Sequence, residues 1–396
     1  MCATISATAV VYFASRGHLL YYGDAQAHLN IARRIWDSRT PGFDQIGTVW
    51  LPLPHVAMLP FVGNNEWWRS GLAGAFPSAA FFVLGCVFLF TATRAAFQNR
   101  GSAWVAVLVV ALNPNLLYLQ AIPMTEAMFF GCSMALLFFT VAFSRKPSVW
   151  FAAGAGVAAF AGSLTRYEGW FVIPFAALFF LLAGRGNRLV AAAVFLAIAL
   201  AGPLAWLAHN RYYWGDFLEF CHGPNSARAI QGDAAYPGRG DWAQAVAQFR
   251  AAAALCAGWP TLILGAAGLL AALSRKRAIW PLILLALPAC FYVMSIHSGS
   301  TPIFVPTLSP NSYYNTRYGI VLLPLGAFAA GALAAVAPRR LESWIARIAI
   351  ALAVGPWLYY HNPQDWITWK ESEVNSQARR AWTTQAAAYL KEKYSP

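Results

Sequence analysis

Long apolar segments, separated by short charged turns and a few longer polar loops, follow one another along most of this 396-residue chain. Segments of this length and apolarity can cross the hydrocarbon core of a bilayer, and they lack the alternation of period two that indicates barrel strands. Two of them, at 149–163 and 170–184, are short for a full crossing and could form a broken pair. We expect eleven helical spans, at about residues 2–16, 70–93, 102–120, 125–144, 149–163, 170–184, 189–208, 251–273, 278–297, 318–337 and 345–360.

The composition also indicates an integral membrane protein. Hydrophobic residues make up 59% of the chain and charged residues 11%, whereas about one quarter of the residues in a soluble domain are charged. The net charge of +13 could suggest a nucleic-acid partner, but the turns between alternate spans, such as 94–100, 145–146, 275–277 and 339–340, hold 12 basic residues against one acidic residue and so carry +11 of this charge. Since basic residues favour the cytoplasmic side, this distribution predicts a cytoplasmic N-terminus and argues against an acidic partner.

The larger polar segments all fall on the other, extracytoplasmic side of this topology. They are the first loop at 17–69, the loops at 209–250 and 298–317, and a C-terminal segment at 361–396 that closes with a small helix. We therefore expect one all-α polytopic membrane domain over residues 1–360, in a prokaryotic inner membrane, with any chemistry at its extracytoplasmic face.

The first loop opens with an amphipathic segment, residues 19–36, that predicts a helix lying in the membrane interface. Asp24 stands near the start of this helix, where its carboxylate would lie at the membrane surface, and His28 follows one turn later on the same face. Asp24 is a candidate catalytic base, and the plain alternative is a helix N-cap. The run at 47–62 holds three prolines, which discourage a regular helix, and we expect a short interfacial or re-entrant piece that carries His55.

Other ionisable side chains near the ends of expected spans are costly in a membrane and are therefore functional candidates. Glu126 begins the fourth span, where it suits either the helix dipole beside a Thr125 cap or a polar pocket. Arg166 and Glu168 either pair with each other or offer a guanidinium to a lipid phosphate, whose oxygens it matches. Arg211 presents a choice between phosphate binding and anchoring at the interface.

Arg317 is the cation that we favour as a phosphate ligand. It lies in the sequence YYNTRYG at the extracytoplasmic end of a late span, between Tyr314 and Tyr318. The neighbouring aromatic and amide groups could flank a sugar or an isoprenoid. The alternative is a tyrosine belt with an anchoring arginine.

These segments together resemble the GT-C superfamily of polyprenyl-phosphate-sugar-dependent glycosyltransferases, which includes the protein O-mannosyltransferases and the aminoarabinose transferases of lipid A. The resemblance covers the overall architecture and the sequences GDAQAHLNIARRIWDS, MTEA, LTRYEG and YYNTRYG. It implies that Asp24 is the catalytic base, that Glu126 is the acid of the second outer loop and that Arg317 binds the phosphate. Many members carry two adjacent acids in the first loop, whereas Ala25 follows Asp24 here, and this departure argues against a two-carboxylate metal site at this position.

The resemblance implies an inverting transfer of a sugar from a polyprenyl-phosphate donor to a hydroxyl of a glycan, lipid or protein acceptor. A polyprenyl phosphate leaves readily, so the reaction needs only a base for the acceptor and positive charge for the departing phosphate. We expect no cofactor, because the sequence holds no dinucleotide or Walker pattern. The need for a divalent metal ion stays open, since no ligand motif supports one.

Two other interpretations remain at this point. A transporter or flippase would use the same charged groups along a translocation path, although the middles of the expected spans hold almost no acids or bases. A non-catalytic assembly subunit would use the outer loops as a docking surface. Both interpretations predict that the purified protein transfers no sugar.

Overall fold

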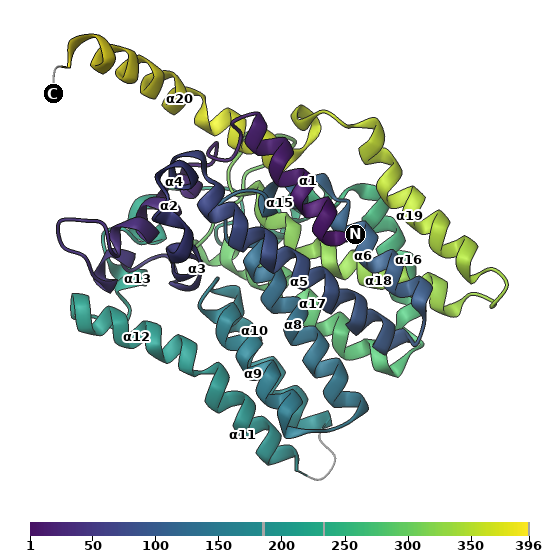
Figure 1. Ribbon diagram of the computed structural model, residues 1–396. Helices are drawn as coiled ribbons and strands as arrows, with labels where there is room; N and C mark the ends of the chain where they lie inside the picture. Colours follow the sequence, from purple (N-terminus) through teal and green to yellow (C-terminus); the bar gives the residue numbers. More distant parts are fainter. Residues whose placement is uncertain (184–186, 233, 395–396) are drawn as a thin grey trace.

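Helices make up nearly all the regular structure of the computed structural model, which describes residues 1–183, 187–232 and 234–394 (Figure 1). In these ranges the sole β pairing is an isolated antiparallel bridge between Phe304 and Tyr314. The first ten α-helices are α1 (Cys2–Ser15), α2 (Gly23–Arg34), α3 (Leu53–Val62), α4 (Asn65–Ser70), α5 (Leu72–Phe97), α6 (Arg100–Ala111), α7 (Pro114–Gln120), α8 (Glu126–Arg145), α9 (Val149–Ser163) and α10 (Glu168–Ala183). The others are α11 (Arg188–Ala199), α12 (Ala201–Trp214), α13 (Glu219–His222), α14 (Ala227–Gln231), α15 (Trp242–Ala257), α16 (Trp259–Leu273), α17 (Lys276–Ser298), α18 (Leu323–Val336), α19 (Glu342–Tyr359) and α20 (Ile367–Lys393). Three short 3-10 helices are η1 (Phe43–Ile46), η2 (Thr316–Leu322) and η3 (Pro363–Asp365).

The all-helical membrane fold expected from the sequence is confirmed, with differences in how the spans are built. Among the described residues, five helices are long and apolar enough to cross a membrane, or seven if two bent pairs each count as one span. The pair α6 and α7 bends by 65° before Pro114, and the pair α15 and α16 bends by 106° at Gly258, whose φ is 82°. The expected spans at 2–16, 149–163 and 170–184 form the shorter apolar helices α1, α9 and α10, and the expected eleventh span forms α19. None of these four is among the helices that are long and apolar enough to cross a membrane.

Glycines allow the long helices to pack closely. A Cβ on Gly131 of α8 would lie 2.6 Å from the carbonyl oxygen of Phe81 in α5, and one on Gly268 of α16 would lie 2.0 Å from that of Ala329 in α18. Helix association in a bilayer depends on such close van der Waals contact, because lipid is as apolar as the helix surfaces. Any larger residue at these two positions would therefore push the paired helices apart.

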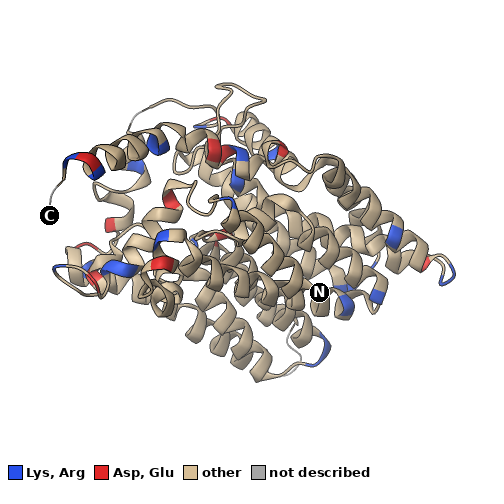
Figure 2. Cartoon of the chain, turned by 45° about the horizontal axis from the view of Figure 1, so that its top comes forward, with Lys and Arg blue, Asp and Glu red and all other residues tan. Residues whose placement is uncertain are grey.

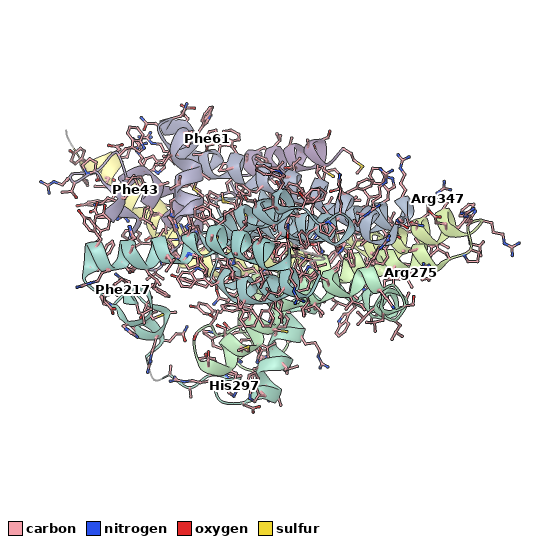
Figure 3. The ribbon with its side chains drawn as sticks, turned by 90° about the horizontal axis from the view of Figure 1, so that it is seen from below. Phe43, Phe61, Phe217, Arg275, His297 and Arg347 are labelled. Atoms are coloured by element: carbon pink, nitrogen blue, oxygen red, sulfur yellow. The ribbon has the colours of Figure 1, made fainter. Side chains whose placement is uncertain are left out.

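The two ends of the bundle differ in charge and in content. Figure 2 shows Lys and Arg with little acidic charge in the turns at one end, whereas the opposite end holds the polar segments and most of the acidic residues, together with further Lys and Arg. Figure 3 places Arg275 and Arg347 at the first end and Phe43, Phe217 and His297 toward the other. The large polar loops therefore share one face, as the sequence pattern predicts.

Two polar segments are more regular than we expected. The proline-rich run forms α3, because Pro52 and Pro54 lie at the start of the helix, where their missing N–H groups would have no partner, and Pro60 lies near its end. The C-terminal segment forms α20, a single helix of 27 residues instead of a small terminal one. Only its first half packs on the bundle, and its second half projects away from it (Figure 1).

Candidate active site

Segments far apart in the sequence bring an ionic cluster together at the end of the bundle that holds the polar loops. Its four carboxylates are Asp24, Glu126, Glu168 and Glu371, and its two guanidinium groups are Arg166 and Arg317. They come from α2, from the starts of α8 and α10 with the turn between α9 and α10, from η2 and from α20. The cluster thus depends on the whole fold.

Arg317 is the centre of the cluster and contacts three carboxylates. Its Nη2 donates to Asp24 Oδ2 at 2.6 Å, its Nε to Glu126 Oε1 at 3.1 Å and its Nη1 to Glu371 Oε1 at 2.9 Å. The backbone N–H of Arg317 also donates to Glu371 Oε2 at 3.0 Å. Every branch of this buried guanidinium therefore has a charged partner.

Arg166 forms the second centre, and Glu126 links the two. Arg166 Nη1 donates to Glu126 Oε1 at 3.1 Å, the same oxygen that accepts from Arg317, and to Thr125 Oγ1 at 2.5 Å. Its Nε donates to Glu168 Oε1 at 2.7 Å, and its Nη2 donates to the hydroxyl of Tyr292, which itself donates to Glu168. Glu126 therefore fixes the spacing of the two guanidinium groups.

Tyrosine rings cover the faces of the guanidinium groups. The ring of Tyr318 lies 4.7 Å from the Cζ of Arg166 and 4.9 Å from that of Arg317, and the ring of Tyr22 lies 4.8 Å from the Cζ of Arg317. Such cation–π contacts hold the charged groups in place without using their N–H donors.

The cluster carries more negative than positive charge, since four carboxylates face two guanidinium groups. These carboxylates take three of the five N–H donors of Arg317, so an anion that binds Arg317 uses the remaining donors against this negative charge or takes the place of a carboxylate. The side chain of Asp24 is 40% exposed, whereas those of Glu126 and Glu371 are 2% and 1% exposed. Asp24 is the partner that can leave at the smallest desolvation cost.

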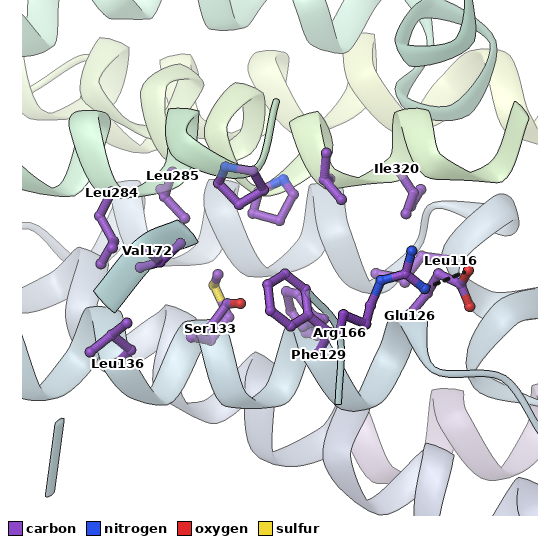
Figure 4. A pocket seen from close by; sticks show the side chains of 15 residues that line it. Leu116, Glu126, Phe129, Ser133, Leu136, Arg166, Val172, Leu284, Leu285 and Ile320 are labelled. Atoms are coloured by element: carbon purple, nitrogen blue, oxygen red, sulfur yellow. Dashed lines mark hydrogen bonds and ion pairs between the residues drawn. The ribbon is translucent and has the colours of Figure 1, made fainter. Parts of the chain in front are cut away.

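Two cavities meet at this cluster. One, of about 140 Å³, is lined by Asp24, His28, Glu126, Arg166, Glu168, Arg317 and Tyr318, together with Trp50 and Tyr292. The other, of about 50 Å³, is lined mainly by apolar side chains of α8, α17 and η2, and Glu126 and Arg166 form its polar end (Figure 4). A polar chamber and an apolar crevice thus share one charged wall, and the buried Oε2 of Glu126 has no hydrogen-bond partner among the described residues.

His28 lines the polar cavity, and His55 contacts it on the side away from the cavity. Its Nδ1 is 2.9 Å from Nε2 of His55, and its ring packs against Trp50 with 4.7 Å between centroids. Burial lowers the pKa of His28 to about 3, and the nearby Arg317 and Arg166 add to this effect. His28 is therefore neutral at physiological pH, and His55 orients it without lining the cavity.

The loop before η2 explains how Arg317 is presented. Phe304 and Tyr314 exchange two backbone hydrogen bonds, of 2.9 and 3.2 Å, and the hydroxyl of Thr316 donates to the carbonyl of Phe304 at 2.8 Å. Asn315 has a φ of 55°, a value that asparagine tolerates better than most residues, and its amide donates to Pro302 at 3.0 Å. The chain therefore turns sharply just before Arg317 and delivers it into the cluster.

Several expectations of local structure need correction. Asp24 is not the N-cap of α2, because the cap position belongs to Tyr22 and the Asp24 carboxylate contacts Arg317. Thr125 does not cap α8 with its side chain and accepts from Arg166 instead. The expected Arg166–Glu168 pair does form, but within the larger cluster.

Besides His55, two more of the proposed binding residues do not line the polar cavity. Arg211 is exposed, donates to the carbonyl of Gly215 and does not line the polar cavity. Tyr314 is 42% exposed and pairs with Phe304 through its backbone. A side chain at the same end of the bundle need not face the same cavity.

Sequence analysis missed Glu371, which completes the shell around Arg317. The buried face of α20 carries Thr368, Ser372 and Ser376 at helical spacing, so it has no apolar stripe to mark it. The available signal was that Thr368, Ser372 and Ser376 recur every four residues, with Glu371 on the same side of the helix. Among the described residues, no group of three or more His, Cys, Asp or Glu side chains could hold a metal ion.

Comparisons with known proteins agree with this architecture. Residues 63–210 match the family described as dolichyl-phosphate-mannose-protein mannosyltransferase. The fold matches the crystal structure of ArnT from Cupriavidus metallidurans bound to undecaprenyl phosphate, with a TM-score of 0.57 and 14% sequence identity, over 98% of this chain and 81% of that one. No curated protein sequence matches the chain. The matched segment and the shared fold together confirm the resemblance of this protein to the GT-C superfamily of glycosyltransferases.

Proposed function

We propose that this protein is an inverting glycosyltransferase that moves a sugar from a polyprenyl-phosphate donor to an acceptor hydroxyl on the extracytoplasmic side of the membrane. The observation that carries the proposal is the contact between Asp24 and Arg317 in a polar cavity that borders an apolar crevice. A lipid phosphate with a sugar needs both environments, one for its chain and one for its head group.

In the proposed reaction, the acceptor oxygen attacks the anomeric carbon as the bond from that carbon to the phosphate oxygen breaks. Asp24 takes the proton of the acceptor hydroxyl, and the departing phosphate keeps the electron pair of the broken bond. Arg317 and Arg166 stabilise the negative charge on the phosphate. One displacement inverts the configuration at the anomeric carbon.

The remaining cavity residues have supporting roles in this proposal. Glu126 holds the two arginines at a fixed spacing, and its free Oε2 can accept a hydrogen bond from a substrate hydroxyl. His28, neutral and held by His55, offers a ring nitrogen to the sugar or acceptor. Because Arg211 and Tyr314 do not line the cavity, the proposal no longer uses them.

Three observations support the donor and the side of the membrane. The description of the matched family names dolichyl-phosphate-mannose, and the ArnT structure of the same fold holds undecaprenyl phosphate. The basic turns gather at the end opposite the cavity, which supports a cytoplasmic location for that end and for the N-terminus.

Mass spectrometry of the purified protein tests the proposal most directly. We expect a polyprenyl phosphate, or a polyprenyl phosphate carrying a sugar, to co-purify with the wild type, and we expect the recovered donor to lose its sugar when an acceptor extract is added. A lipid that is moved across proteoliposomes without any covalent change would instead support a flippase.

A further inference from the structure

Glu371 is the least exposed carboxylate of the ionic cluster and comes from α20. Both of its oxygens bind Arg317, Oε1 to the guanidinium Nη1 at 2.9 Å and Oε2 to the backbone N–H at 3.0 Å. The carboxylate therefore joins the two ends of one residue and closes a ring through the Arg317 side chain. An arginine side chain has several rotatable bonds, and this ring removes most of that freedom.

The helix that carries Glu371 is itself fixed to the segments around the cavity. The backbone N–H of Thr368 donates to Asn115 Oδ1 at 3.1 Å, and the hydroxyl of Tyr22 donates to the carbonyl of Thr368 at 2.8 Å. The hydroxyls of Ser372 and Tyr118 are 2.9 Å apart. The part of α20 that carries Glu371 is thus fixed by hydrogen bonds to α7 and to Tyr22, the residue before α2.

A purely structural role accounts poorly for a carboxylate at this position. The N–H at the start of η2 needs one acceptor, and a neutral serine or asparagine would serve without the cost of burying a charge. The second oxygen instead binds Nη1, while Glu126 takes Nε. With those two donors occupied, Nη2 is the branch that reaches Asp24 at the polar cavity.

We propose that Glu371 is a positioning residue, which holds Arg317 so that Nη2 faces the cavity and can receive the phosphate of the donor. This inference rests on the proposed function, since it assigns Arg317 to a lipid phosphate. Glu371 does not touch the substrate and acts only through Arg317.

Binding of undecaprenyl phosphate to the purified protein tests this inference. Glu371→Gln keeps the shape of the side chain but presents an N–H₂ group to one of its two donors, so the ring opens. We expect the affinity for undecaprenyl phosphate to fall about tenfold or more, as for the loss of a buried charged hydrogen bond, and the KM for the donor to rise more than kcat falls. Glu373→Gln is the matched control, because it removes a carboxylate from the same helix without contact to Arg317.

Non-additivity separates positioning from a general loss of structure. In an Arg317→Ala background, Glu371→Gln should cause no further loss of lipid affinity, because the residue it acts through is gone. If Glu371→Gln does not fold, Glu371→Asp provides the same comparison, since it keeps the charge and shortens the reach by one methylene.

The outcomes distinguish the two levels of the proposal. A wild type that binds no polyprenyl phosphate would refute the proposed function itself. Two results would refute the positioning role and leave the proposed function intact. One is a Glu371→Gln variant that binds the lipid as tightly as the wild type does, and the other is a double variant whose loss of lipid affinity is the sum of the losses from Glu371→Gln and Arg317→Ala.

Discussion

Replacing Asp24 with asparagine should separate sugar transfer from lipid binding and move them in opposite directions. The substitution removes the proposed base while keeping the size of the side chain. It also removes the negative charge that occupies Arg317 Nη2 at 2.6 Å. The incoming phosphate would then no longer compete with a carboxylate for that donor.

The expected magnitudes follow from the exposure and role of Asp24. General-base catalysis contributes about a hundredfold to ten-thousandfold, so kcat should fall by that range. The Asp24 side chain is 40% exposed, and an ion pair of this kind contributes about 1 kcal/mol at most. Relief of this competition should therefore tighten binding of undecaprenyl phosphate by up to about fivefold.

Two measurements on one protein preparation check this prediction, namely lipid affinity in detergent and transfer from the donor recovered with the wild type. Asp37→Asn is a matched control, because Asp37 lies just after the same helix and pairs with Arg33 outside the cavity. Retention of wild-type turnover by Asp24→Asn would remove Asp24 as the base. A tenfold loss of lipid affinity would show instead that Asp24 helps to bind the donor.

Three further predictions concern the phosphate site, the apolar crevice and pH. Arg317→Ala should weaken the binding of undecaprenyl phosphate by about tenfold to a hundredfold, as for the loss of a charged hydrogen bond in a buried site. Arg211→Ala, outside the polar cavity, should change this affinity less than twofold. Equal effects of the two substitutions would argue against the assigned cavity. Ser133→Trp should fill the apolar crevice and raise the KM for the donor, whereas Ser144→Trp at the exposed end of α8 should leave this KM unchanged. An unchanged KM in both variants would place the lipid chain elsewhere. The pKa of His28 in the folded protein is about 3, so below about pH 6.5 only the unfolded chain takes up a proton at this residue. Between pH 7 and pH 5 the free energy of unfolding of the wild type should therefore fall by about 2 kcal/mol more than that of His28→Asn. Thermal unfolding in detergent measures this difference.

The sequence was informative wherever a single segment carries its own signal. The helix that carries Asp24 was predictable because its apolar stripe has helical spacing, and Leu29 and Ala32 of that stripe are indeed buried. Arg317 was identifiable as an ionisable side chain at the end of an apolar segment. The bend before Pro114 within the expected span at 102–120 was not predictable, because it is compatible with an unbroken apolar pattern.

Membership of the ionic cluster was not predictable from any one segment. Glu371 lies 54 residues from Arg317 along the chain, in a helix whose buried face is polar, and nothing near it marks it as part of a site. Glu126 was expected to be either a dipole partner or a pocket residue, and only its position between two guanidinium groups shows how it is used.

Apolar runs and charged turns alone therefore determined that this is a helical membrane protein with its polar segments on one face, because burying backbone polar groups in lipid permits few other structures. Tertiary structure decided which charges meet, which carboxylate of the cluster is the most exposed and which arginines line the cavity. The physical reason is that pairing and desolvation depend on neighbours within a few ångströms, and here those neighbours come from helices distant in the chain.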